Sequence, residues 1–223
     1  MSDSLSNSYL YLSYFLNDQT PLYGGGNGID ITPINEIDLG DTANTKSICL
    51  HNHSGTHIDF PNHFIAEGKT SEQYEASFWI FNCPSLFEYK AKKNQIINFK
   101  MDDFKHIPSE TDFIIIKTDF GKYRGTELYW KNNPGFSPES AQVLRDQFPQ
   151  LRVIGMDLIS LTSYQNRELG RVAHRHFLGG HRPLLLVEDM DLEKLTKSPK
   201  KIICSPLMID KVDGAPVTVI AEL

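Results

Sequence analysis

Four residues that commonly bind divalent metals lie at alternating positions of one short segment. They are His53, His57, Asp59 and His63, in a stretch of eleven residues. In an extended chain, side chains alternate between two faces, so these four would point to the same side. Imidazole and carboxylate groups are good ligands for zinc and related divalent ions. The segment therefore predicts a metal site.

The spacing of the first two histidines favours a bend in this segment. A straight strand covers about 13 Å over four residues, which is close to the limit for two imidazoles that share one ion. Gly55 lies midway between them and tolerates unusual backbone angles. A helix is disfavoured, because Asp59 would leave the face shared by the two histidines and Pro61 would interrupt the turn. The helical zinc motif H-E-x-x-H is also absent, since Ser54 occupies its glutamate position.

The segment resembles the signature of a known family. The pattern His53-x-Gly55-Thr56-His57-x-Asp59-x-Pro61-x-His63 is similar to that of the cyclase family of metal-dependent hydrolases, which includes bacterial kynurenine formamidase and isatin hydrolase. Residues 20–24 resemble the family's Thr-Pro-x-Trp-Pro-Gly block. Residues 174–178 and 188–192 resemble its His-Arg-x-Leu-Leu and Glu-Asn-Leu-x-Leu blocks.

The resemblance implies further metal ligands from the C-terminal half. Glu188 follows the apolar run 183–187 and matches the family's glutamate at or beside the metal, although the residues alone equally favour a solvated strand end. Matching neighbours selects His174 as the distal histidine, whereas matching the distance to the glutamate selects His176. A helix separates the two by roughly 200°, so they cannot both face one ion, and we expect His174. With Asp59 as a bridge, the site would hold one or two ions, zinc or manganese.

The reaction expected from the resemblance is hydrolysis of an amide or cyclic amide, as in an arylformamidase. A divalent ion lowers the pKa of water from about 15.7 towards 7 and polarises a carbonyl. The resemblance gives His63 the role of general acid/base, which suits an unperturbed imidazole pKa of about 6.5. It also places Tyr23 at the family's substrate-stacking tryptophan and Gly24 at its proline. These departures, and a different stretch at 163–171, put N-formylkynurenine in doubt as the substrate.

Other functions remain open at this level. The same metal could serve a lactone hydrolase, or a lyase or cyclase that uses the ion as a Lewis acid. A metal-binding protein without turnover is a third alternative, for which a closed site of four ligands would be typical.

Composition limits the remaining possibilities. The chain has 223 residues, 40% of them hydrophobic, which suits one domain over residues 1–223. The net charge of −6 argues against nucleic-acid binding. No apolar run approaches the ~20 residues of a membrane span, and residues 1–6 lack the pattern of a signal peptide. Three separated cysteines fit a reduced compartment, so a cytoplasmic location is expected. The partners expected are a small-molecule substrate and, from the resemblance, further copies of the chain.

The pattern of apolar residues predicts an α/β domain. Helices are expected from residue 137 to before Pro149 and at 168–178, and a short one around 191–195. The resemblance implies a swivelling β/β/α arrangement with a central barrel-like mixed sheet and a few flanking helices. The strands expected from the residues lie at 9–16, 47–50, 113–117, 152–157, 183–187, 202–208 and 217–223.

Overall fold

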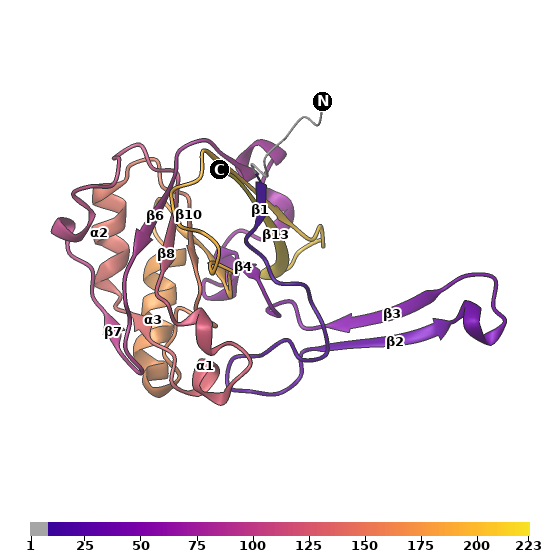
Figure 1. The fold of residues 1–223 in the computed structure, drawn as a ribbon. Coiled ribbons are helices and arrows are strands. Elements are labelled where there is room, and N and C mark those ends of the chain that lie inside the picture. Colours follow the sequence, from indigo (N-terminus) through magenta and orange to yellow (C-terminus); the bar gives the residue numbers. More distant parts are fainter. Residues whose placement is uncertain (1–8) are drawn as a thin grey trace, which may run out of the picture.

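A mixed sheet of nine strands forms the centre of the computed structural model, which describes residues 9–223 (Figure 1). Eight strands follow in the order β5-β12-β13-β4-β11-β10-β8-β6, and β1 pairs with the C-terminal end of β13. Neighbours from β11 to β6 are parallel, whereas β4 and the strands beyond it are antiparallel. The strands are β1 (Tyr9–Tyr11), β4 (His57–Asp59), β5 (Ile80–Phe81), β6 (Pro84–Glu88), β8 (Phe113–Lys117), β10 (Val153–Met156), β11 (Leu185–Glu188), β12 (Lys201–Pro206) and β13 (Gly214–Glu222).

The apolar strands of this sheet are buried on both faces. In β8, Ile114 and Ile116 pack in the cluster that contains the helices, whereas Phe113 and Ile115 pack in a second cluster on the other face. This alternation follows from the period of two in a strand. Helices α1 (Glu127–Lys131), α2 (Glu139–Gln147) and α3 (Arg167–Leu178) lie on the side of the first cluster (Figure 1).

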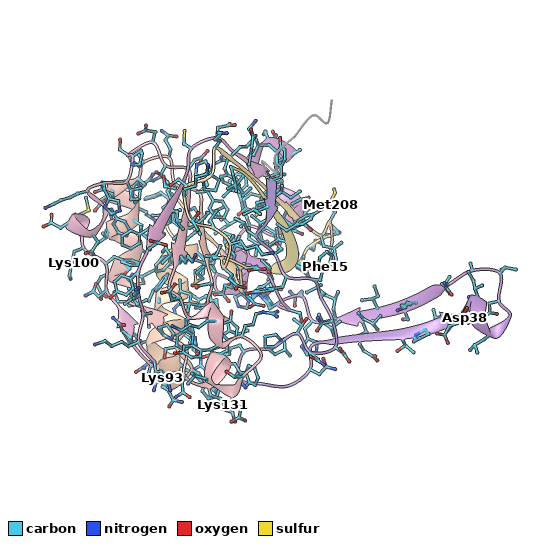
Figure 2. All side chains as sticks on the ribbon, in the orientation of Figure 1. Phe15, Asp38, Lys93, Lys100, Lys131 and Met208 are labelled. Atoms are coloured by element: carbon cyan, nitrogen blue, oxygen red, sulfur yellow. The ribbon has the colours of Figure 1, made fainter. Side chains whose placement is uncertain are left out.

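A β-hairpin extends far from this body. Strands β2 (Ile29–Asn35) and β3 (Thr45–Leu50) form a separate two-stranded sheet, and Asp38 lies near the tip of the hairpin (Figures 1 and 2). Figure 2 shows its side chains directed outward, in contrast to the dense packing of the body. A second small sheet pairs β7 (Ile96–Ile97) with β9 (Gly135–Phe136).

The expected α/β class, with a single domain and a barrel-like mixed sheet, is confirmed, and most strands lie within two residues of their predicted bounds. The strand expected at 9–16 ends at Tyr11. Beyond it Leu12 still donates to the Val219 carbonyl of β13, but Ser13 forms only an isolated bridge, with Met190, and the regular pairing stops. The helix expected around 191–195 is wrong: this stretch is an irregular turn in which Leu195 bonds back to Leu192.

No helix within residues 9–223 has the length and apolar character needed to cross a membrane. Residues 1–6, where the sequence shows no signal-peptide pattern, lie outside the described part of the chain.

Candidate active site

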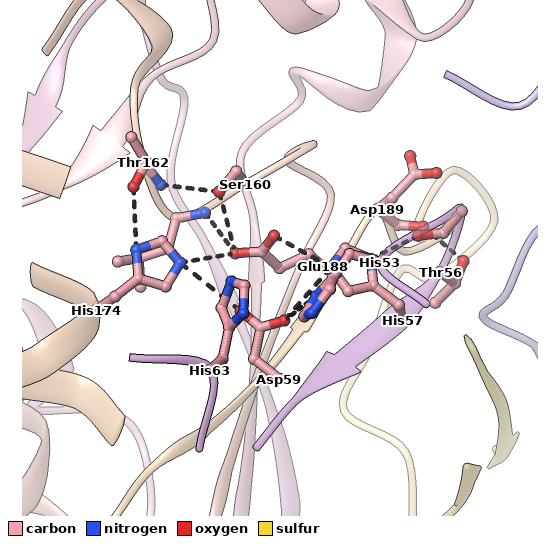
Figure 3. Close-up of polar contacts among 12 residues, drawn as sticks. His53, Thr56, His57, Asp59, His63, Ser160, Thr162, His174, Glu188 and Asp189 are labelled. Carbon is pink, nitrogen blue, oxygen red and sulfur yellow. Dashed lines mark hydrogen bonds and ion pairs between the residues drawn. The ribbon is translucent and has the colours of Figure 1, made fainter. Parts of the chain in front are cut away.

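Two neighbouring strands place three of the expected ligands on one face of the sheet. Strands β4 and β11 are antiparallel, with Glu188 opposite His57 and Leu186 opposite Asp59. Because side chains alternate along a strand, His57, Asp59 and Glu188 share a face, while Ile58 enters the core on the other face. Figure 3 shows the three side chains converging there.

His53 reaches the same place through a bend in the chain. The straight strand covers only residues 57–59, and Gly55 before it has a φ of +63°, a conformation that glycine adopts without strain. The His53 ring lies against the backbone of Gly214: a Cβ added at Gly214 would lie 2.3 Å from the Cε1 atom of His53. The bend expected at Gly55 is therefore present.

Helix α3 contributes His174 from the opposite side of the site. The ring is 2% exposed, and its Nδ1 atom lies 2.9 Å from the carbonyl oxygen of Gly170 and 3.0 Å from the hydroxyl of Thr162. His176 is exposed on the outer face of the helix. The structure thus brings the first of the two candidate histidines to the site and leaves the second in solvent.

The donor atoms of His57 and His174 lie at distances from the two carboxylates that suit ligands of a shared metal ion better than hydrogen bonds. The Nε2 atom of His57 is 3.5 Å from both Asp59 Oδ1 and Glu188 Oε2, and the Nε2 atom of His174 is 3.7 Å from Asp59 Oδ2 and 3.6 Å from Glu188 Oε1. These distances are too long for hydrogen bonds, but two ligands of one tetrahedral ion are about 3.4 Å apart. The buried Oδ2 atom of Asp59 has no hydrogen-bond partner among the described residues. Buried carboxylates normally have such a partner or bind a cation.

Asp59 belongs to two sets of candidate ligands. Its carboxylate lies with His53 and His57 in one set and with His174 and Glu188 in the other, and the ligand atoms of each set are within 4.8 Å of one another. The nearest contacts to the two sets use different oxygens of Asp59. The arrangement can therefore hold one ion in either set or two ions bridged by this carboxylate.

The second nitrogen of each of these histidines is fixed by a neighbour. The Nδ1 atom of His57 donates to the Gly55 carbonyl at 2.8 Å, which leaves Nε2 free to act as a ligand. For His53 the Nδ1 atom faces Asp59 at 2.9 Å, while Nε2 faces Asp213 at 2.9 Å. Such outer partners orient metal-binding imidazoles and select their tautomer.

The charges of these groups depend strongly on one another. Burial lowers the pKa of His53, but its hydrogen bonds to Asp213 and Asp59 outweigh burial and raise the pKa to about 10. Burial raises the pKa of the Asp59 carboxyl, but contacts with His53 and His57 hold it well below its usual range. Without a metal, protons on the imidazoles therefore balance the buried carboxylates.

His63 follows the strand on a short 3-10 turn, Pro61–His63, and meets an aspartate that the sequence analysis did not identify. Its Nδ1 atom donates to Asp213 Oδ2 at 2.7 Å. This bond leaves Nε2 of His63 free to exchange a proton, as in other His–Asp pairs. Asp213 lies 150 residues along the chain, directly before β13, and no spacing in the sequence connects it with the histidines.

A pocket of about 340 Å³ opens over these groups. His53, His57 and His174 line it, and Tyr23 lies in its wall. The substrate-stacking role expected for Tyr23 stays a prediction. Burial raises the pKa of Tyr23 to about 12 despite the nearby charge of Arg167, so the phenol stays protonated. Ser160 also lines the pocket, and its hydroxyl lies 3.4 Å from Glu188. Cys49 is exposed on strand β3 of the hairpin and does not line this pocket.

Comparison with known proteins identifies relatives along nearly the whole chain. Kynurenine formamidase of Geobacillus thermodenitrificans (strain NG80-2) is 24% identical over 214 residues, which cover 96% of each chain. Cyclase-like protein 3 of Oryza sativa subsp. japonica is 24% identical over 190 residues; the match covers 80% of this chain and 65% of that protein's length.

Solved structures share the fold. Isatin hydrolase A from Labrenzia aggregata, bound to benzyl benzoate, aligns with a TM-score of 0.79 and 20% identity, covering 96% of this chain and 92% of that chain. A potential metal-dependent hydrolase with cyclase activity aligns with a TM-score of 0.74 and 21% identity, covering 96% of each chain. The family model named Cyclase matches residues 10–162, which is more than half of the sequence. The chain belongs to the cyclase family.

Proposed function

We propose that this protein is a metal-dependent amidohydrolase that cleaves an amide or cyclic amide of a small molecule, with arylformamidase activity as the nearest named case. One observation carries the proposal: two sets of candidate ligands, all buried except the half-buried His53, share Asp59 at the floor of an open pocket, beside a histidine that is hydrogen-bonded to an aspartate. The similarity to a kynurenine formamidase and to isatin hydrolase A supports this reaction class.

The ligands proposed are those that the structure brings together. His53, His57 and Asp59 would hold one ion, and His174 and Glu188 would complete a second site with the shared carboxylate. The nitrogen and oxygen donors suit zinc or manganese. A bound ion of this kind lowers the pKa of water and polarises a carbonyl oxygen. The open pocket favours catalysis over a purely structural metal, whose site would be closed.

His63 is proposed to move the proton that the reaction requires. Water adds its oxygen to the carbonyl carbon, the C–N bond breaks, and a proton from the water passes through His63 to the leaving nitrogen. The hydrogen bond from Nδ1 to Asp213 keeps Nε2 of His63 available for this transfer and stabilises the imidazolium. Asp213 is therefore a positioning residue.

The proposal is tested by elemental analysis of the purified protein and by a panel of formanilides, N-formylkynurenine, isatin and simple lactones. We expect stoichiometric zinc or manganese, hydrolysis of at least one amide, and loss of activity with a chelator that metal restores. The variant His63→Ala should keep its metal and lose about 10²–10⁴-fold in kcat. His176→Ala is the matched control, because that exposed imidazole lies outside the pocket and its loss should leave kcat unchanged.

Three results would contradict the proposal. Full activity of His63→Ala would remove the acid/base role of this residue. Turnover of lactones alone would favour the lactone hydrolase. A tightly bound metal whose removal unfolds the protein, with no turnover of any compound, would favour the structural role.

A further inference from the structure

Two arginines line the pocket on the same helix face that delivers a metal ligand. Arg167 and Arg171 are separated by one turn of α3, and His174 follows three residues later. Residues at these spacings share a helix face. Both arginines line the pocket, and they place positive charge there although the chain as a whole carries a net charge of −6. A local cationic wall in an acidic protein can attract and hold an anion.

Arg167 is the arginine whose charge is available. Within residues 9–223 it forms no ion pair with an aspartate or glutamate, whereas Arg171 pairs with Glu168. The guanidinium carbon of Arg167 lies 3.8 Å from the ring centroid of Tyr164 and 6.0 Å from that of Tyr23. A guanidinium stacked on an aromatic ring keeps its N–H edges free for a planar, bidentate partner. The stack also fixes the orientation of the group before a ligand arrives.

The two acidic groups at the floor of the pocket do not compete for Arg167. Asp59 and Glu188 are 1% and 3% exposed and face the histidines. Arg167 and His174 are seven positions apart, so their backbones are about 10 Å apart along the helix axis. The cation and the proposed metal site therefore lie at two separated places in one pocket.

We infer that the substrate carries a carboxylate at a distance from the amide that is cleaved, and that Arg167 binds this carboxylate. The inference rests on the proposed function and specifies its substrate class. The amide carbonyl lies over the metal ligands, a planar part of the substrate passes Tyr23, and the carboxylate meets the guanidinium edge. Arg171 adds a weaker attraction, because Glu168 already offsets its charge.

The inference is tested with pairs of substrates that differ only in charge. The metal-loaded protein is assayed with 4-formamidobenzoate and 4-formamidobenzamide, and with 3-(4-formamidophenyl)propanoate and its primary amide. We expect kcat/KM to favour the carboxylate by about tenfold in at least one pair, mainly through KM, because a charge-assisted hydrogen bond is gained. Arg167→Gln should bring this ratio close to one, and Arg167→Lys should keep part of it.

Arg175→Gln is the matched control, because Arg175 is exposed on the same helix and does not line the pocket. This variant should keep the full preference for the carboxylate. A wild-type ratio near one in both pairs, or a ratio that Arg167→Gln leaves unchanged, would overturn the inference while the proposed hydrolysis stands. If no amide of the whole panel, isatin and N-formylkynurenine included, is hydrolysed, the proposed function fails. Calorimetric binding of 4-aminobenzoate against 4-aminobenzamide then still decides whether Arg167 binds a carboxylate.

Discussion

Asp213 connects the two histidines at the mouth of the site. Its Oδ2 atom accepts from both His53 and His63, and its Oδ1 atom accepts from Asn52 at 2.7 Å. One carboxylate thus orients a proposed metal ligand and the proposed proton carrier. A single substitution should therefore disturb both metal affinity and proton transfer.

For Asp213→Asn we expect kcat to fall and metal affinity to weaken, each by about 10- to 100-fold, because an amide oxygen no longer stabilises an imidazolium and an outer partner of His53 is lost. Steady-state kinetics at saturating metal separate the two effects. Asp210→Asn is the control, since Asp210 is exposed and its carboxylate, among residues 9–223, makes only a 3.9 Å contact with Lys211. Unchanged kcat and affinity in Asp213→Asn would show that the pair has no role.

Metal binding should release protons. In the metal-free protein the pKa of His53 is about 10, raised from 6.5 by Asp213 and Asp59 against the opposing effect of burial. A raised pKa stabilises the folded metal-free protein most below about pH 6.5, and this contribution disappears as pH rises through 10. An ion must displace this proton, so its affinity should rise with pH by about tenfold per unit for each proton lost.

Calorimetry in buffers of different ionisation enthalpy measures this release. We expect at least one proton per ion bound at neutral pH. A binding enthalpy that does not depend on the buffer would show that the histidine is already deprotonated.

At the scale of secondary-structure elements, the bend before β4 positions the site. Gly55 has a φ of +63°, and an added Cβ would lie 2.3 Å from Leu16 Cδ2. Gly55→Ala should therefore lower the free energy of unfolding by more than the ~1–2 kcal/mol of a left-handed backbone alone. Gly40→Ala is the matched control, because Gly40 has a φ of +99° and no atom within 4 Å of an added Cβ.

Denaturant unfolding of the two variants measures the difference. We expect Gly55→Ala also to bind metal more weakly, because a shift of the bend moves His53. Equal stability of the two variants would mean that the side chain of Leu16 adapts without cost.

At the scale of the whole molecule, the hairpin is the feature that most needs explanation. Isolated two-stranded hairpins are marginally stable in water, and this one exposes four large apolar side chains. They are Ile34, Ile37, Leu39 and Ile48, exposed by 63%, 53%, 78% and 61%. The expected homo-oligomer would cover them with a second copy of the chain.

Light scattering should therefore give a mass that is a multiple of 25.4 kDa. The double variant Ile34→Lys, Ile48→Lys should shift this mass towards the monomer, because it places charge on the apolar surface. Thr32→Lys adds a charge on the same strand without removing an apolar group and should keep the oligomer. A monomeric wild-type protein would show that the expectation is wrong. The cytoplasmic location stays a prediction.

The sequence identified the segment with the candidate metal ligands, because the spacing of ligands along a strand is a local property. Alternation along a strand placed His57 and Asp59 on one face, and glycine between the two histidines indicated the bend. Short β-branched runs such as Phe113–Lys117 identified core strands for the same reason. Of the long hairpin only the second strand was predicted, at 47–50; β2 was missed, because it is largely exposed and contains Pro33, which disfavours a strand.

Local pattern by itself determined which side chains could bind a metal and that they lie on extended chain. Only the tertiary structure decided which distant groups join them, because contacts between residues more than 100 positions apart depend on strand pairing and helix packing. The register of β11 against β4 sets Glu188 opposite His57, and the rotation of α3 selects His174 over His176. Strand β13 begins where it brings Asp213 to His63, a meeting that no spacing along the chain encodes.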